Sequence, residues 1–84
     1  MWILTTFGFF SVVQKPGEMS LTVRARAASD LERLREHYLP KLSVTISKGG
    51  TDYPFRATIS HAAFARGLAK IGNCLLYTSD AADE

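Results

Sequence analysis

Three arginines on two alternating segments are the residues of this chain best suited to bind a ligand. Arg24 and Arg26 lie within residues 21–26, and Arg56 lies within residues 53–59. Both segments alternate between apolar and polar side chains, which predicts β-strands with the arginines on the polar face. If the two strands are neighbours, three guanidinium groups share one sheet face. Because the planar guanidinium fork matches phosphates and carboxylates, we expect an anion-binding face.

Aromatic side chains near the N-terminus could add to this face. Phe9 or Phe10, exposed on the first strand, would provide a stacking platform for single-stranded nucleic acid. The expected partner is therefore nucleic acid or an acidic protein. Two alternatives stay open. Arg24 and Arg26 could be solvated strand positions whose charges discourage edge pairing, or the same face could pack on another copy of the chain or on a partner subunit.

The sequence contains no set of residues that predicts catalysis. His37 and His61 are expected on different helices, with no carboxylate or cysteine at metal-ligand spacing. The run at residues 49–52 is not followed by the helix start and Gly-Lys-Ser/Thr of a phosphate-binding loop, so we expect a hairpin connection there. We therefore expect a non-enzymatic binding module without a cofactor or a metal.

Four extended segments are expected to carry these side chains. Residues 2–13 are rich in aromatic and β-branched residues and predict one strand, broken or bulged near residues 6–8. Residues 21–26, 42–47 and 53–59 alternate. Their apolar sets are expected to face the core: Leu21, Val23 and Ala25; Leu42, Val44 and Ile46; Tyr53, Phe55, Ala57 and Ile59. Trp2 is also expected in the core.

Two amphipathic helices are expected to cover the sheet. Ser29 followed by Glu32 is a capping-box pattern, so the first helix is expected to begin there. Ser60 is expected to cap the second helix. Two small residues of that helix, Ala63 and Gly67, are expected to permit close packing.

The order of these elements is ββαββα, which predicts an α+β fold with a four-stranded antiparallel sheet and both helices on one face. Spatial order 1-2-4-3 gives a permuted ferredoxin-like sandwich and makes residues 21–26 and 53–59 neighbours. Order 2-1-3-4 or a symmetric variant is the main rival. In either arrangement one face of the sheet carries no helix, and the arginines lie on that face.

The last eleven residues, 74–84, resemble a translated sequencing-library adapter of the transposon-end type rather than a protein segment. We therefore expect one α+β domain over residues 1–73, truncated at its C-terminus, followed by an artefactual tail that packs poorly. Without Asp80, Asp83 and Glu84 the domain has ten basic and five acidic residues, a net charge of +5. This balance favours anionic partners through long-range attraction.

Composition favours a cytoplasmic protein. The chain's one cysteine, Cys74, lies in the adapter-like tail, so residues 1–73 offer no disulfide. No apolar stretch reaches the roughly 18 residues of a membrane helix, so no membrane association is expected. Residues 1–13 lack the basic start and the cleavage site of a signal peptide.

Three motifs carry a family resemblance. Residues 2–11 read W-x-x-T-x-x-G-F-F-S, residues 24–26 read R-A-R, and residues 52–56 read D-Y-P-F-R. These motifs resemble a widespread family of short, uncharacterised bacterial proteins whose members carry a D-Y-x-Y-R strand, and the similarity covers nearly all of residues 1–71. The resemblance implies a fold and a reading frame but no mechanism. It also implies an aromatic Y-x-N-F-K-like segment after the second helix, which this chain lacks.

Overall fold

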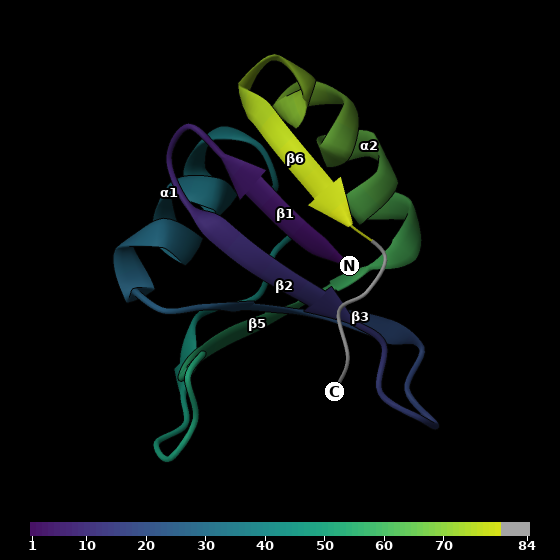
Figure 1. The fold of residues 1–84 in the computed structure, drawn as a ribbon. Helices are drawn as coiled ribbons and strands as arrows, with labels where there is room; N and C mark the ends of the chain where they lie inside the picture. Colours follow the sequence, from purple (N-terminus) through teal and green to yellow (C-terminus); the bar gives the residue numbers. More distant parts are fainter. Residues whose placement is uncertain (80–84) are drawn as a thin grey trace.

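A computed structural model describes residues 1–79, which build an antiparallel sheet of six strands with two helices (Figure 1). The strands are β1 (Trp2–Thr5), β2 (Phe9–Val13), β3 (Ser20–Ala25), β4 (Ile46–Ser47), β5 (Phe55–Ser60) and β6 (Leu75–Ser79). The helices are α1 (Ala28–His37), between β3 and β4, and α2 (His61–Ile71), after β5. A short 3-10 turn, η1 (Gly72–Cys74), leads into β6.

The strands lie side by side in the order β4-β5-β3-β2-β1-β6, and each neighbouring pair is antiparallel. The α+β class and the predicted pairing of residues 21–26 with 53–59 are confirmed, because β3 pairs with β5. That pairing excludes the rival order 2-1-3-4. The predicted four-stranded, ferredoxin-like sheet with ββαββα order is wrong, since the described residues form three strands before α1 and a sixth strand after α2.

Residues 2–13 form a hairpin of two strands rather than one bulged strand. Thr5 closes its turn: Thr5 Oγ1 donates to the carbonyl oxygen of Gly8 at 2.8 Å and accepts from the backbone N–H groups of Phe7 and Gly8 at 3.2 and 3.0 Å. A short hydroxyl side chain that bonds nearby backbone in this way stabilises a turn in place of a continued strand. The predicted bulge is therefore the reversal point of the chain.

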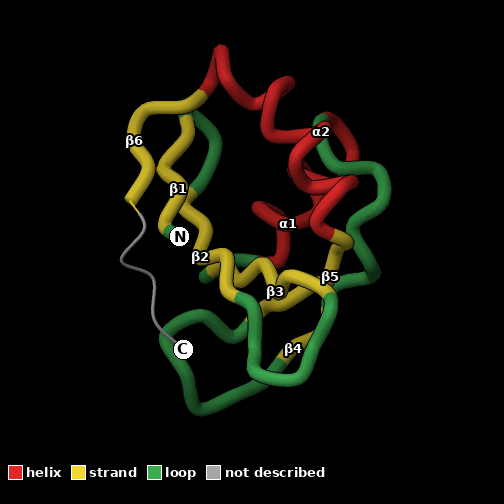
Figure 2. The backbone as a smooth tube through the Cα atoms, turned by 90° about the vertical axis from the view of Figure 1, so that its right-hand side faces the viewer, coloured by secondary structure: helices red, strands yellow, loops and turns green. Residues whose placement is uncertain are grey.

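Both helices pack on one face of the sheet, as predicted. The main chain curves so that the strands wrap around the helix layer (Figure 2). Side chains from both layers form one buried cluster: Ile3, Phe10, Val12, Val23, Ala25, Ala57 and Ile59 from the sheet, Leu31 and Leu34 from α1, Ala63, Phe64 and Ile71 from α2, and Leu39 and Leu42 from the segment after α1. Within residues 1–79, no helix is long and apolar enough to span a membrane.

The two helices begin differently. Ser60 caps α2 as predicted, because its Oγ accepts from the backbone N–H of Ala63 at 3.2 Å. The predicted capping box of α1 is wrong: Ala27 occupies the N-cap position without a side-chain bond, and Ser29 lies inside the helix. Glu32 is instead engaged with Arg35 and with the segment before β4.

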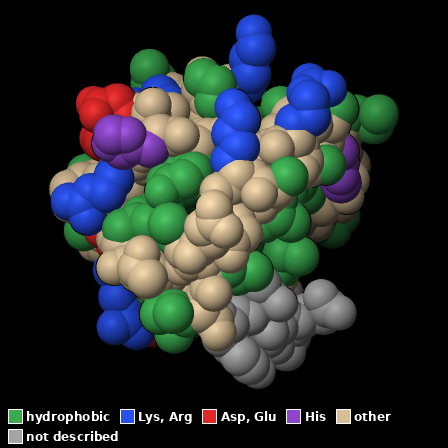
Figure 3. All heavy atoms as spheres, turned by 90° about the horizontal axis from the view of Figure 1, so that it is seen from above, with side chains coloured by type: hydrophobic (Ala, Val, Ile, Leu, Met, Phe, Trp, Pro, Cys, Tyr) green, Lys and Arg blue, Asp and Glu red, His purple; other side chains and the backbone are tan. Residues whose placement is uncertain are grey.

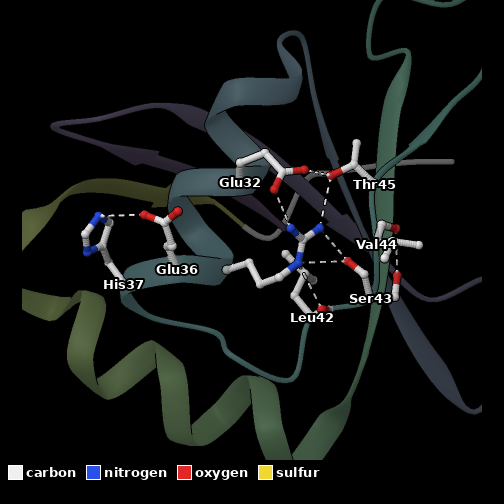
Figure 4. A network of polar contacts seen from close by, with 8 residues as sticks. Glu32, Glu36, His37, Leu42, Ser43, Val44 and Thr45 are labelled. Atoms are coloured by element: carbon white, nitrogen blue, oxygen red, sulfur yellow. Dashed lines mark hydrogen bonds and ion pairs between the residues drawn. The ribbon is translucent and has the colours of Figure 1, made fainter.

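Arg35 connects α1 to residues 42–45. Figure 4 shows the network that includes Glu32, Leu42, Ser43 and Thr45. The Arg35 guanidinium donates to the carbonyl oxygens of Leu42 and Ser43, to Thr45 Oγ1 at 3.1 Å and to Glu32 Oε1 at 2.5 Å. Thr45 Oγ1 donates to the other carboxylate oxygen of Glu32 at 3.0 Å. The hydrogen bonds from Thr45 and from Arg35 lower the pKa of Glu32, because both favour the charged carboxylate.

Replacing Glu32 by glutamine is expected to lower the free energy of unfolding at pH 7, in a pH-dependent way. The folded-state pKa lies below the ordinary value of 4.5, so the carboxylate's contribution is complete above that value and is lost as the pH falls through the folded-state pKa. Urea unfolding midpoints of both proteins should therefore converge on acidification. Glu36→Gln is the matched control, because it removes a carboxylate of the same helix that does not contact Arg35 or Thr45. Equal losses of unfolding free energy in the two variants at pH 7 would contradict this role of Glu32.

The prediction for residues 42–47 is only partly correct. Leu42 is buried, but Val44 is 76% exposed and Ile46 is 58% exposed. β4 contains two residues at the edge of the sheet, and the Arg35 contacts turn the preceding residues toward α1. Alternation alone predicted three inward side chains, yet at this edge no helix covers the side on which Ile46 lies.

The adapter-like tail contributes a strand. Residues 75–79 pair with β1, and Leu75 is half-buried against the core, whereas Leu76 is 62% exposed. The expectation that the tail packs poorly is wrong for Leu75, and residues 80–84 lie outside the described part of the chain. The physical reason is that an edge strand presents unpaired N–H and C=O groups, which any extended segment can satisfy.

Candidate anion-binding sheet face

A row of five residues crosses the sheet on the face opposite the helices. The pairings Trp2 with Ser11, Ser11 with Arg24, Arg24 with Arg56, and Arg56 with Ile46 place these side chains next to one another. Sequence neighbours of the first four of these residues point into the core, so the row itself points away from the helices. We call it the cross-strand row. The predicted placement of Arg24 and Arg56 on one face is confirmed.

Arg24 is not the solvated side chain that the sequence led us to expect. It is 7% exposed, and its Nη2 donates to Ser11 Oγ, itself fully buried, at 2.7 Å. Arg56 is half-buried beside it, and the buried Nε of Arg56 has no hydrogen-bond partner within residues 1–79. The two arginines face each other directly across the β3–β5 pairing.

Three aromatic rings gather at one end of this face. Trp2 and Phe9 are stacked, with ring centroids 5.3 Å apart and an angle of 4° between their planes. Tyr53 tilts against both rings, at 5.4 Å from Trp2 and 6.4 Å from Phe9. The guanidinium carbon of Arg26 lies 5.3 Å from the centre of the Tyr53 ring. The three rings and Arg26 form what we call the aromatic cluster.

The sequence predicted only part of this cluster. Tyr53 was expected in the core, because in a regular strand it would lie on the same face as Phe55, Ala57 and Ile59. Tyr53 precedes β5, however, and Pro54 separates it from the strand. Pro54 interrupts the regular alternation, so the face of Tyr53 cannot be predicted from that of the strand residues. That proline was the available signal. Trp2 was also expected in the core but is half-buried in the cluster.

The structure separates the two phenylalanines that were predicted as stacking residues. Phe9 lies in the aromatic cluster and is half-buried. Phe10 is 1% exposed and belongs to the core, so the expectation that it is available for stacking is wrong. Adjacent residues of a strand point to opposite faces, which allows only one of the two to lie with Arg56.

The side chains of this face are of types that can contact a ligand. It offers aromatic rings, guanidinium donors and the buried hydroxyl of Ser11. Within the described residues, no group of three or more His, Cys, Asp or Glu side chains could hold a metal ion. His61 Nε2 lies 3.0 Å from Gln14 Oε1, and His37 Nε2 lies 3.7 Å from Glu36 Oε1, so the two histidines belong to separate local contacts.

Comparisons with protein-family models, with curated proteins and with solved structures found no match for this chain. The resemblance to short bacterial proteins therefore stays a prediction from the sequence motifs. The function has to be inferred from the geometry of the sheet face.

Proposed function

We propose that this chain is a non-enzymatic binding module that holds single-stranded nucleic acid on the helix-free face of its sheet. The observation that supports the proposal is the gathering of Trp2, Phe9 and Tyr53 beside Arg26, on the face that also carries Arg56. Bases of every type stack on aromatic rings, and guanidinium groups bind phosphates. A strand of nucleic acid carries bases and phosphates at regular spacing.

The rings favour a single strand over a duplex or an acidic protein. Base–aromatic stacking contributes about 1–3 kcal/mol per base and requires a base that is not already stacked in a duplex. An acidic protein would engage the arginines but would gain little from the rings. Arg26 is exposed and Arg56 is half-buried, so these two are the phosphate contacts, while the buried Arg24 positions Ser11 and its neighbours.

Single-strand binding is expected to depend on Arg26 and Arg56. Fluorescence anisotropy with a labelled oligothymidine, measured over a salt series, should give an affinity that falls as salt rises. The double change Arg26→Ala/Arg56→Ala is expected to weaken binding about 10–100-fold at low salt. It should also reduce the slope of log K against log salt by about 1.4, because each phosphate contact on a single strand contributes about 0.7.

Lys15→Ala/Arg33→Ala is the matched control, since it removes two positive charges from outside the face. It is expected to change the affinity far less. Circular dichroism checks that both variants remain folded. Binding that is insensitive to salt, or that survives loss of Arg26 and Arg56, would overturn the proposal.

A second candidate function is self-association or assembly with a protein partner through the same side of the sheet. The observation that favours it is the exposure of Val44 and Ile46 at the β4 edge, where Ile46 lies opposite Arg56. Exposed apolar residues on an edge strand are typical of an association surface. A mass by light scattering that rises with concentration, together with no oligonucleotide binding, would favour this function over the first.

A further inference from the structure

A groove of about 200 Å³ lies between α2 and the segment that follows α1. Tyr38 and Lys41 line one side, and Arg66, Gly67 and Lys70 line the other. Neither α2 nor the segment after α1 contributes a residue to the cross-strand row or to the aromatic cluster. The groove is therefore separate from the sheet face and does not depend on the proposed function.

Three positive charges surround this groove, and its lining contains no carboxylate from residues 1–79. Arg66 and Lys70 are four residues apart on α2 and therefore neighbours on one side of the helix. Like charges at this spacing destabilise a helix, and Lys41 adds a third from across the groove. Seen from above, Lys and Arg side chains rise from this end of the molecule with hydrophobic side chains between them (Figure 3).

Uncharged residues of the lining make the groove small and add no negative charge to it. Gly67 has no side chain, which lets Leu39 and the carbonyl oxygen of Tyr38 approach α2 closely. The hydrogen bond between Tyr38 Oη and Cys74 Sγ, 3.1 Å long, raises the pKa of Tyr38, so the phenol brings no negative charge. The groove is smaller than the about 300–1,000 Å³ of sites for drug-sized ligands, which favours a compact anion.

We propose that this groove binds a phosphate group, with Lys41, Arg66 and Lys70 as its ligands. Three cationic donors from two segments can surround the oxygens of one tetrahedral anion, and the mutual repulsion of Arg66 and Lys70 is relieved when the anion lies between them. The phosphate could belong to a small free molecule or to a nucleic-acid strand, and the two sources share this recognition chemistry.

Pyrophosphate is the probe for the test, added to the full chain at low salt and followed by amide chemical shifts. The largest shifts are expected at Lys41, Gly67 and Lys70. Arg66→Gln/Lys70→Gln is expected to weaken pyrophosphate binding at least tenfold. The matched control Lys15→Gln/Arg33→Gln removes the same charge elsewhere and is expected to weaken it less than twofold.

The outcomes separate a site from general charge attraction. Shifts spread evenly over all Lys and Arg residues, or an equal loss in the control variant, would overturn the proposal. Competition by an oligothymidine at the same amides would identify the phosphate as that of a nucleic-acid strand, and its absence would identify a small free anion. Arg26→Ala/Arg56→Ala should leave pyrophosphate binding unchanged, so this proposal and the sheet-face function can fail independently.

Discussion

Replacing Phe10 by alanine is expected to destabilise the fold by about 3–5 kcal/mol, the typical cost of removing a buried phenylalanine ring. Phe10 is 1% exposed, and the cavity that it helps to line has a volume of only about 10 Å³. The ring is therefore closely packed, and its removal is expected to leave a new cavity that the neighbouring side chains fill only in part. Since small domains have about 5–15 kcal/mol of stability in total, urea unfolding should show a large drop in midpoint.

Phe9→Ala is the matched control, because Phe9 is the adjacent residue of β2 and its identical ring lies on the other face of the sheet. It loses the stack with Trp2, which contributes about 0.5–1.5 kcal/mol, so its unfolding midpoint should change much less. The same variant should weaken oligothymidine binding by about 1–3 kcal/mol, or about 5–150-fold, if a base stacks there. Equal destabilisation by both changes would contradict the assignment of Phe9 and Phe10 to opposite faces.

At the centre of the sheet, alternation in the sequence correctly predicted which side chains face the helices. Val23 and Ile59 are buried as predicted, and Arg24 lies opposite Arg56 because both strands have helices on one side only. Val23 and Ile59 lie on central strands and belong to the core beneath the helices, so the hydrophobic effect acts on every second side chain of these strands. The same local information predicted the Ser60 cap, which involves residues only three apart.

At the edges and turns, long-range contacts decided the outcome. Nothing in the sequence of residues 42–47 indicates that Arg35 will donate to the carbonyl oxygens of Leu42 and Ser43. Without knowledge of that contact, the alternation predicts that Val44 is a core residue. Phe7 resembles a strand residue, yet it lies in the β1–β2 turn, where its ring stacks on Tyr38, 5.1 Å away. Trp2 and Tyr53 were not predicted to join Phe9 in the aromatic cluster for the same reason, since the three rings come from two strands and a loop.

Replacing Gly67 by alanine is expected to destabilise the fold by about 1–3 kcal/mol, the usual cost of overpacking. A Cβ at this position would overlap Leu39 Cδ2 and lie 2.9 Å from the backbone oxygen of Tyr38. Leu39 is 1% exposed, and a backbone oxygen cannot turn away, so the segment after α1 would have to move. This cost must exceed the roughly 1 kcal/mol that alanine gains over glycine in a helix interior. Thermal unfolding should show a lower midpoint.

Gly72→Ala is the matched control at the end of the same helix. Gly72 has helical dihedral angles, φ −48° and ψ −38°, and a Cβ there meets no atom within 4 Å. Alanine at this position should therefore stabilise the protein by about 0.4–1 kcal/mol, by restricting the unfolded chain. If both variants raised the midpoint, Leu39 and Tyr38 could not lie over α2 as described. The groove beside them would then lose the wall that holds Lys41 opposite Arg66 and Lys70.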